Sequence, residues 1–205
     1  KTIQSIKNDK KGALWVGGGF GVSRIVGSGI ATMESRKELP SGIYAMLEDT
    51  EGCVWIATES EGLIQLVDGK FGVYSTLDGL LSDVSYSIFQ TAQNDIWIST
   101  QKGLNRFRNN AFDLKITSQD ALPNVRLGTM NADDAGNLWI GTAKGLLRWQ
   151  DNRLVNIKGI ESLSKKIVQV IYRDAENNLW IGTNLGLSFY NPQSENAGII
   201  SFDQS

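Results

Sequence analysis

DDAGNLWIGTAKGLLRW, residues 133–149, recurs in altered form along the whole chain. Five tryptophans stand in equivalent versions of it, 40 to 42 residues apart: Trp15, Trp55, Trp97, Trp139 and Trp180. Self-similarity at such a period is typical of a chain that uses one supersecondary unit repeatedly. We therefore expect five repeat units of about 41 residues, 1–40, 41–82, 83–123, 124–164 and 165–205.

Each unit predicts four short strands. A strand-like run such as GIYAML (42–47) leads into a polar turn, in which Gly or Asn stands three residues before the tryptophan. Hairpin turns often need a positive φ at such a position. The tryptophan strand alternates large and small apolar residues, as in LWIG (138–141), and this pattern suits a strand packed on both faces. With a third strand and a weaker fourth, the unit has the pattern of a β-propeller blade, so the predicted fold class is all-β.

The recurring tryptophan has a structural role in this fold. A bulky ring on the second strand would fill the gap to the neighbouring sheet and bury roughly 150–250 Å². In an antiparallel meander, the turns before the tryptophan strands lie at one end of the sheets. The loops after these strands and the connections between units lie at the other end.

Composition excludes several kinds of chemistry. The 205 residues contain no histidine and one cysteine, with a formal net charge of −2 and 41% hydrophobic residues. The commonest general base and metal ligand is therefore missing, as is any internal disulfide. No apolar run is long enough to span a membrane, no basic patch suggests nucleic acid or a membrane surface, and the first residues lack a signal-peptide pattern. We expect no metal, no cofactor and no catalytic residues.

Residues that recur at equivalent positions are predicted to be framework. The aspartates of the polar turns should accept backbone N–H bonds in their own turn instead of binding calcium. The threonines that end the tryptophan strands should bond the adjoining turn, and the arginines of the third strands should be solvated or paired. These three sets are Asp9, Asp49, Asp133 and Asp174; Thr58, Thr100, Thr142 and Thr183; and Arg24, Arg106 and Arg148.

Residues that differ between equivalent positions are better candidates for ligand binding. Along the first strands, two tyrosines and two glutamines would make an asymmetric rim suited to a sugar. The loops after the tryptophan strands vary as well, with acidic, basic and amide side chains. The candidate binding residues are Gln4, Tyr44, Tyr86, Gln169, Glu59, Lys102, Lys144 and Asn184.

The repeats resemble those of the two-component regulator propeller family. The resemblance rests on residues 133–149, on DAENNLWIGTNLGLSFY (174–190) and on EDTEGCVWIATESEGLIQL (48–66). The connectors LDGLLSDVS (77–85) and QDALPNVR (119–126) are similar to that family's segment between blades. This resemblance implies the extracytoplasmic, periplasmic sensory portion of a bacterial inner-membrane receptor, and it implies that the chain is a fragment.

Five units could close into a five-bladed disk or form consecutive blades of a larger ring. The first unit begins with a first strand and the last ends with a fourth, so no blade combines strands from both ends of the chain. The resemblance implies rings of seven blades, and together these points favour an incomplete arc. An arc leaves apolar sheet faces exposed, and we therefore expect possible self-association through them.

Three functions remain open. The favoured one is a non-catalytic sensor that binds a small molecule, possibly an oligosaccharide, or a protein on the face that carries the loops after the tryptophan strands. A propeller lyase or glycosidase would need two carboxylates about 5–10 Å apart near the channel. A structural spacer that binds nothing is the third.

Overall fold

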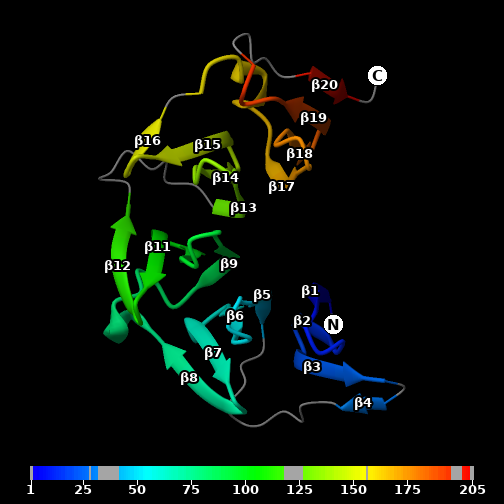
Figure 1. The fold of residues 1–205 in the computed structure, drawn as a ribbon, viewed down its shortest axis with the longest axis vertical. Coiled ribbons are helices and arrows are strands. Elements are labelled where there is room, and N and C mark those ends of the chain that lie inside the picture. The colour runs from blue at the N-terminus through cyan, green and yellow to red at the C-terminus, as the bar shows by residue number, and fades with distance from the viewer. Residues whose placement is uncertain are drawn as a thin grey trace. The chain divides into compact units, whose positions relative to one another are not determined.

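The computed structural model describes residues 2–27, 29–31, 42–117, 127–155, 157–194 and 200–203. The predicted unit boundaries at 40/41 and 123/124 and the connector 119–126 lie outside these residues. The regular elements within these residues are strands (Figure 1) and two short 3-10 segments, η1 (Thr76–Asp78) and η3 (Glu161–Leu163). In this part of the chain, no helix is long and apolar enough to cross a bilayer.

The strands form five four-stranded antiparallel sheets, each within one sequence repeat. The first sheet contains β1 (Ile3–Asn8), β2 (Leu14–Gly18), β3 (Gly21–Val26) and β4 (Gly29–Ala31). The second contains β5 (Ile43–Glu48), β6 (Val54–Thr58), β7 (Leu63–Val67) and β8 (Lys70–Tyr74). The third contains β9 (Ser85–Gln90), β10 (Ile96–Thr100), β11 (Gly103–Arg108) and β12 (Ala111–Ile116).

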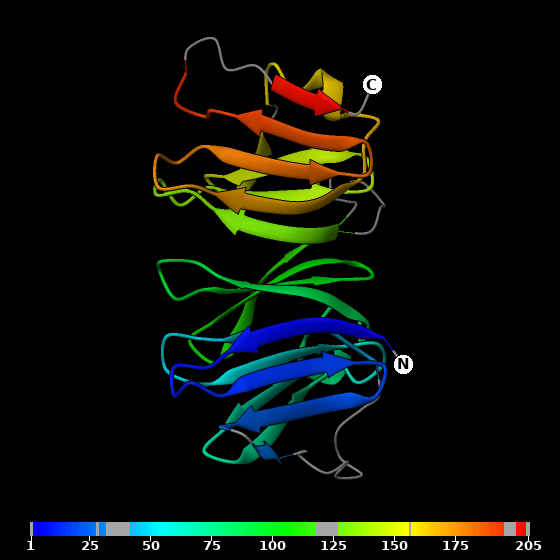
Figure 2. The ribbon, with the colours of Figure 1, turned by 90° about the vertical axis from the view of Figure 1, so that its right-hand side faces the viewer.

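The last two sheets repeat this order. The fourth contains β13 (Leu127–Ala132), β14 (Leu138–Thr142), β15 (Gly145–Gln150) and β16 (Arg153–Val155). The fifth contains β17 (Val168–Arg173), β18 (Leu179–Thr183), β19 (Gly186–Tyr190) and β20 (Ile200–Asp203). Within each sheet the strands lie side by side in chain order (Figure 2), which confirms the predicted all-β class and four-stranded meander.

The chain packs as two compact units. One comprises Lys1–Gln90 and Asn94–Lys115, and the other comprises Thr91–Gln93 and Ile116–Ser205. In the first unit the first strands of three consecutive sheets, β1, β5 and β9, are neighbours. In the second unit β13 and β17 are neighbours in the same way. The favoured incomplete arc concerns how these units are arranged, and it stays a prediction.

The polar turns have the backbone that the sequence predicts. The residue three positions before each tryptophan has a positive φ, from 65° to 86°, in all five repeats. Gly adopts this conformation without strain and Asn does so more readily than most residues, which explains why these two residue types alternate at this position. These residues are Gly12, Gly52, Asn94, Gly136 and Asn177.

Three of the tryptophans, Trp15, Trp55 and Trp139, lie between neighbouring sheets of the same unit, as predicted. Trp15 packs in a cluster with Met46 and Ile56 of the second sheet, and Trp55 packs with Ile98 of the third. Trp139 is fully buried in a cluster that includes Ile171 and other residues of the fifth sheet. The ring of one sheet is therefore covered by the first two strands of the next sheet.

A small residue two positions after the tryptophan permits this close packing. A Cβ atom added at Gly17 would lie 2.8 Å from Ile43 Cγ2 of the second sheet. At Gly141 the corresponding contact is 2.6 Å, to Val168 Cγ1 of the fifth sheet. Real Cβ contacts are not this short, so the small residue is a condition for the approach of the neighbouring sheet.

Candidate functional site

The candidate residues of the first strands all lie at irregular points of the strand pairing. Ile43 pairs with Thr58 and Ala45 with Ala57, so Tyr44 is an extra residue on its strand. Such a β-bulge interrupts the ladder and turns the side chain in a new direction. The same irregularity occurs at Gln4, Tyr86 and Gln169, and in the fourth sheet it includes Gly128. The five repeats thus share one bulge, and its residue differs from sheet to sheet.

In the first unit the bulges bring two aromatic side chains together. The rings of Tyr44 and Tyr86 lie 5.5 Å apart, centroid to centroid, at an angle of 61°. Both tyrosines are half-buried, whereas Gln4 on the neighbouring strand β1 is exposed. We call Gln4, Tyr44 and Tyr86, with the nearby loop residues Glu59 and Lys102, the bulge rim.

The loops of the bulge rim are held by the backbone. The N–H of Glu59 donates to the Gly42 carbonyl at 2.8 Å, and a Cβ at Gly42 would lie 2.5 Å from Glu59 Oε2. The carboxylate of Glu59 therefore folds back beside the start of β5. In the next sheet, Gln101 donates to the carbonyl of Val84 at 3.0 Å, and this bond holds the loop that carries Lys102. Glu59 and Lys102 are both exposed at the same end of their sheets as the tyrosine pair.

The second unit carries Lys144, Gln169 and Asn184, which are all exposed. Asn184 has a structural role, because its Oδ1 accepts the N–H of Ile167 at 2.7 Å and its own N–H donates to the Ile167 carbonyl at 3.1 Å. Lys144 uses its backbone N–H to bond the Thr142 hydroxyl at 3.0 Å, so its ammonium group is not needed for the turn. Of these three candidates, Lys144 and Gln169 thus have side chains without a described role in holding a loop.

The recurring polar residues have the framework contacts that the sequence predicts. Each turn aspartate accepts backbone N–H groups in its own turn, as Asp133 Oδ1 does from Asn137 at 2.9 Å. Each of the four threonines donates its hydroxyl to a carbonyl of the following turn, as Thr142 does to Gly145 at 2.9 Å. The structure adds that each aspartate also accepts the indole N–H of its tryptophan, which the sequence analysis missed. The constant spacing of six residues between Asp and Trp was the available signal.

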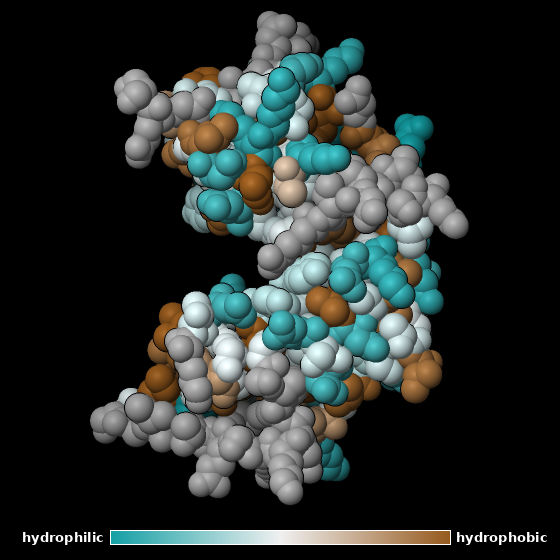
Figure 3. Space-filling view, turned by 180° about the vertical axis from the view of Figure 1, so that it is seen from behind, coloured by the Kyte–Doolittle hydropathy of each residue, from teal (hydrophilic) through white to brown (hydrophobic). Residues whose placement is uncertain are grey.

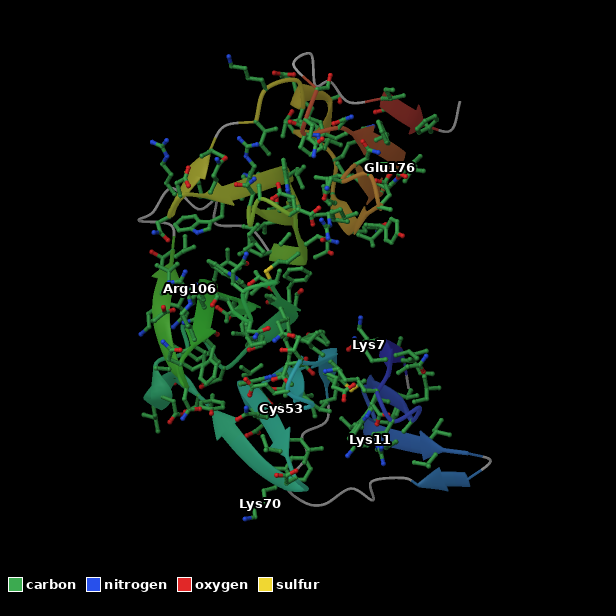
Figure 4. All side chains as sticks on the ribbon, in the orientation of Figure 1. Lys7, Lys11, Cys53, Lys70, Arg106 and Glu176 are labelled. Atoms are coloured by element: carbon green, nitrogen blue, oxygen red, sulfur yellow. The ribbon has the colours of Figure 1, made fainter. Side chains whose placement is uncertain are left out.

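The recurring arginines stack on the tryptophan of their own sheet. The guanidinium carbons of Arg24, Arg106 and Arg148 lie 5.4 to 5.8 Å from the ring centroids of Trp15, Trp97 and Trp139. Arg24 also donates to Asp9 Oδ2 at 2.7 Å, and Arg106 (Figure 4) pairs with Asp113 at 2.9 Å. Arg24 and Arg106 are thus paired within their own sheets, whereas the Nε of Arg148 is buried without a hydrogen-bond partner.

The described residues offer no assembled metal centre. They contain no group of three or more His, Cys, Asp or Glu side chains that could hold an ion. Cys53 is buried in the first unit (Figure 4), and burial together with the carboxylates of Asp49 and Glu51 raises the pKa of its thiol. A raised pKa disfavours the thiolate, which is the nucleophilic form.

A cavity lies at the opposite end of the first two sheets, between their polar turns. Its volume is about 570 Å³, within the range of small-molecule sites. Trp15, Val54 and Leu66 form part of its wall, and Lys11 and Glu51 stand on the two turns. No site was expected here from the sequence, because the cavity depends on the spacing between two turns about 40 residues apart in the chain.

The repeats match a known family. The profile of the two-component regulator propeller matches residues 38–60, 79–102 and 162–185, each of which spans a connector, a first strand and a tryptophan strand. A comparison with curated proteins gave no match.

Solved structures share the fold. The extracellular domain of BT3049 from B. thetaiotaomicron, described as a hybrid two-component system, superposes with a TM-score of 0.79 at 24% identity, over 95% of this chain and 29% of that one. The extracellular domain of BT4673 from the same organism gives 0.76 at 20% identity, over 98% of this chain and 31% of that one. A catalytically inactive histidine-to-alanine variant of virginiamycin B lyase from Staphylococcus aureus, with quinupristin, gives a TM-score of 0.76 at 14% identity. The match covers 99% of this chain and 71% of that one.

The chain thus spans about 30% of the length of the two receptor domains. Identities below 25% establish the fold alone, and the family match supplies the kind of repeat. The chain therefore carries two-component regulator propeller repeats, and these repeats fold as blades of a β-propeller.

Proposed function

We propose that this chain is a non-catalytic, ligand-binding part of the extracytoplasmic sensor of a bacterial inner-membrane receptor, and that the bulge rim is where a ligand binds. The similar receptor domains are described as extracellular parts of two-component systems, which supports a sensory role and this location. The rim lies at the sheet ends that carry the loops after the tryptophan strands.

The β-bulge shared by all five repeats is the observation that carries this proposal. The framework residues are nearly constant from repeat to repeat, yet the bulge position holds Gln, Tyr, Tyr, Gly and Gln. Bulges are over-represented beside functional sites, where they re-aim a side chain. The bulge has the same backbone conformation in every repeat but a different side chain, so the repeated fold can present a specific surface.

The rim residues suit a polyhydroxylated ligand such as an oligosaccharide. Tyr44 and Tyr86 offer aromatic rings with hydroxyl groups, and Gln4 offers an amide that can both donate and accept. Glu59 and Lys102 add an acceptor and a donor of opposite charge. A few polar groups around an aromatic surface are typical of small-molecule sites.

A thermal-shift screen of neutral and acidic oligosaccharides, followed by calorimetry, tests the proposal. A ligand at about 100 times its Kd should stabilise the chain by about 2.7 kcal/mol. Tyr44→Ala, Tyr86→Ala and Lys102→Ala should each weaken its binding at least tenfold. Lys70→Ala is the matched control, because Lys70 is exposed on the edge strand β8 (Figure 4), and it should leave binding unchanged.

Two results would contradict the proposal. Binding that survives all three rim substitutions would place the ligand elsewhere, for instance in the cavity between the first two sheets. A screen in which no oligosaccharide stabilises the chain would favour the structural spacer.

A lyase is the second candidate, because a lyase superposes over nearly the whole chain. That lyase is inactive when one histidine is replaced, and the present chain has no histidine. An enzyme here would have to use carboxylates, lysine or tyrosine. Mass spectrometry of any ligand found above should recover it unchanged after prolonged incubation, and a cleaved product would establish the enzyme.

A further inference from the structure

An aromatic ring covers the tryptophan in two of the interfaces between sheets. In the third sheet, Phe107 pairs with the residue before the tryptophan, and its ring centroid lies 5.1 Å from that of Trp55 in the second sheet. In the fifth sheet Tyr190 holds the same position, and its ring centroid lies 5.7 Å from that of Trp139 in the fourth. Both pairs are edge-to-face, a favourable geometry for aromatic rings.

The interface between the first two sheets has an aliphatic residue at this position. Leu66 pairs with the residue before the tryptophan of its own sheet, as Phe107 and Tyr190 do. Leu66 is half-buried, whereas Phe107 and Tyr190 are buried. Phe71 packs against the same apolar cluster as Leu66 but does not line the cavity described above, whose wall includes Trp15 and Leu66. The cavity thus lies beside a tryptophan that lacks a covering ring.

The equivalent place in the second unit holds much less space. A cavity lies there between the polar turns of the fourth and fifth sheets, with Arg148 in its wall as Arg24 is in the wall of the larger one. Its volume is about 130 Å³, against about 570 Å³ in the first unit. The interface with the small cavity has the ring of Tyr190 where the interface with the large cavity has Leu66.

The two walls of the larger cavity carry opposite charges. The first sheet contributes three basic side chains, and the second sheet contributes three acidic ones. The basic residues are Lys10, Lys11 and Arg24, and the acidic residues are Glu48, Glu51 and Asp68. Asp9 adds a carboxylate on the first sheet, but it is paired with Arg24 at 2.7 Å. A dipolar ligand would therefore be oriented across the cavity, with its negative end toward the first sheet.

Some of these charged residues join the two polar turns. The ammonium group of Lys10 donates to the carbonyls of Asp49 at 2.9 Å and Thr50 at 2.7 Å. In return, Glu48 Oε2 accepts the backbone N–H of Lys10 at 2.7 Å. These bonds hold the turns of the first two sheets at a fixed separation, so the cavity between them is preformed.

The other charged groups are available to a ligand. Lys11 (Figure 4) and Glu51 are held in their turns by backbone N–H groups, which donate to aspartate carboxylates at 3.0 Å, and both side chains are exposed. Asp68 is exposed on the turn between β7 and β8. Arg24 uses its Nε and Nη2 for Asp9, which leaves Nη1 for another acceptor.

Apolar side chains lie between these charges. Exposed apolar residues occur elsewhere too, as brown residues among teal ones in a space-filling view show (Figure 3), and scattered singly they need no functional explanation. In the cavity, however, Trp15, Val54 and Leu66 line one volume together with groups of opposite charge. An apolar wall with a few polar groups, at this volume, is typical of a small-molecule site.

We propose that this cavity binds an aromatic amino acid as its zwitterion. The ring of the ligand packs beside Trp15, where the other two interfaces have an aromatic side chain. Its carboxylate accepts hydrogen bonds from Lys11 and Arg24. Its ammonium group donates to Glu51 and Asp68. The site lies at the opposite end of the sheets from the bulge rim and holds whether or not the rim binds a ligand.

Calorimetry of the whole chain with L-phenylalanine and L-tryptophan tests the proposal. The wild type should bind at least one of them with a Kd of about 1 mM or tighter. The amide of that amino acid lacks the carboxylate and its deamino analogue lacks the ammonium group, so each should bind at least tenfold more weakly. Leu66→Phe supplies the ring that the other interfaces have. It should abolish binding without lowering the midpoint of thermal unfolding.

Charge variants give a second test that does not depend on how Leu66→Phe folds. Lys11→Ala and Glu51→Gln change exposed side chains and should each weaken binding at least tenfold. Lys115→Ala is the matched control, because Lys115 is exposed on β12 outside the cavity, and it should bind like the wild type. Binding that is unchanged in both charge variants would overturn the proposal.

Three further results would also overturn it. The first is a wild type that binds neither amino acid, and the second is a folded Leu66→Phe variant that still binds one. The third is a loss of amino-acid binding in Tyr44→Ala or Tyr86→Ala, which would place the ligand at the bulge rim. Oligosaccharide binding at the rim has no bearing on these outcomes, so the two proposals succeed or fail separately.

Discussion

The indole Nε1 of Trp55 donates a 2.7 Å hydrogen bond to Oδ2 of Asp49, six residues earlier. The other oxygen of this carboxylate accepts the N–H groups of Glu51 at 3.0 Å and Cys53 at 2.8 Å. One side chain thus orders the turn and orients the ring that the next sheet covers. The same pair forms at Trp15–Asp9, Trp139–Asp133 and Trp180–Asp174.

Replacing this carboxylate should destabilise the fold. Asp49→Ala leaves a buried indole N–H and two backbone N–H groups without acceptors, and should lower the free energy of unfolding by about 2–4 kcal/mol in urea. Glu176→Ala, at an exposed position of another polar turn (Figure 4), should stay within about 0.5 kcal/mol. If Asp49→Ala loses as little stability as the control Glu176→Ala, the hydrogen bond between Asp49 and Trp55 does not hold the turn.

The tryptophans should differ in their contribution to stability. Trp139→Ala should cost about 3–5 kcal/mol, because the ring is fully buried under the fifth sheet. Trp180→Ala, at the equivalent but half-exposed position, should cost about 1–2 kcal/mol in dilute protein. Equal losses at the two positions would contradict the assignment of Trp139 to an interface between sheets.

The close approach of the second sheet to the tryptophan strand β2 predicts that a larger residue at Gly17 is destabilising. Gly17→Ala places a methyl group 2.8 Å from Ile43 Cγ2 and should cost about 1–3 kcal/mol. Gly19→Ala meets nothing within 4 Å and should be nearly neutral. Differential scanning calorimetry of the two variants compares them directly, and a neutral Gly17→Ala would mean that the first two sheets do not approach as described.

The free energy of unfolding should fall in acid, partly because the carboxylate of Asp9 becomes protonated. Burial alone would raise its pKa, but hydrogen bonds from Arg24, Ala13 and Trp15 outweigh burial and lower it to about 2. Since the folded-state pKa is below the unfolded value, the stabilisation is full above about pH 4 and is lost as the pH falls toward 2. In urea titrations, the difference in the free energy of unfolding between the wild type and Asp9→Asn should become smaller as the pH falls from about 4 to 2. A difference in the free energy of unfolding that does not change with pH would contradict the lowered pKa of Asp9.

The sequence predicted most of the fold because the fold is local and repeated. The turn glycines and asparagines, the strand order and the interface role of the tryptophans all follow from patterns within about 20 residues. The hydrogen bond between Asp49 and Trp55 was not predicted, because Asp49 was expected to bond only its own turn and Trp55 only to fill the interface. The constant spacing of six residues was the signal for it.

The candidate site was less accessible from the sequence. The variable positions of Gln4, Tyr44, Tyr86 and Gln169 were visible, but the bulge that they share depends on strand register, which alternation alone does not give. The cavity beside Trp15 and the link from Thr50 to Gln90 join side chains about 40 residues apart. These features depend on how one sheet docks on the next.

Solvent access to the individual indoles tests the central claim, that the tryptophans hold neighbouring sheets together, most directly. The six tryptophans can be labelled with 5-fluorotryptophan, assigned by single Trp→Phe variants, and followed by fluorine NMR with a soluble paramagnetic probe. In dilute protein the signals of Trp15, Trp55 and Trp139 should stay sharp, while that of Trp180 broadens. Broadening of Trp55 and Trp139 to the same extent as Trp180 would contradict the account.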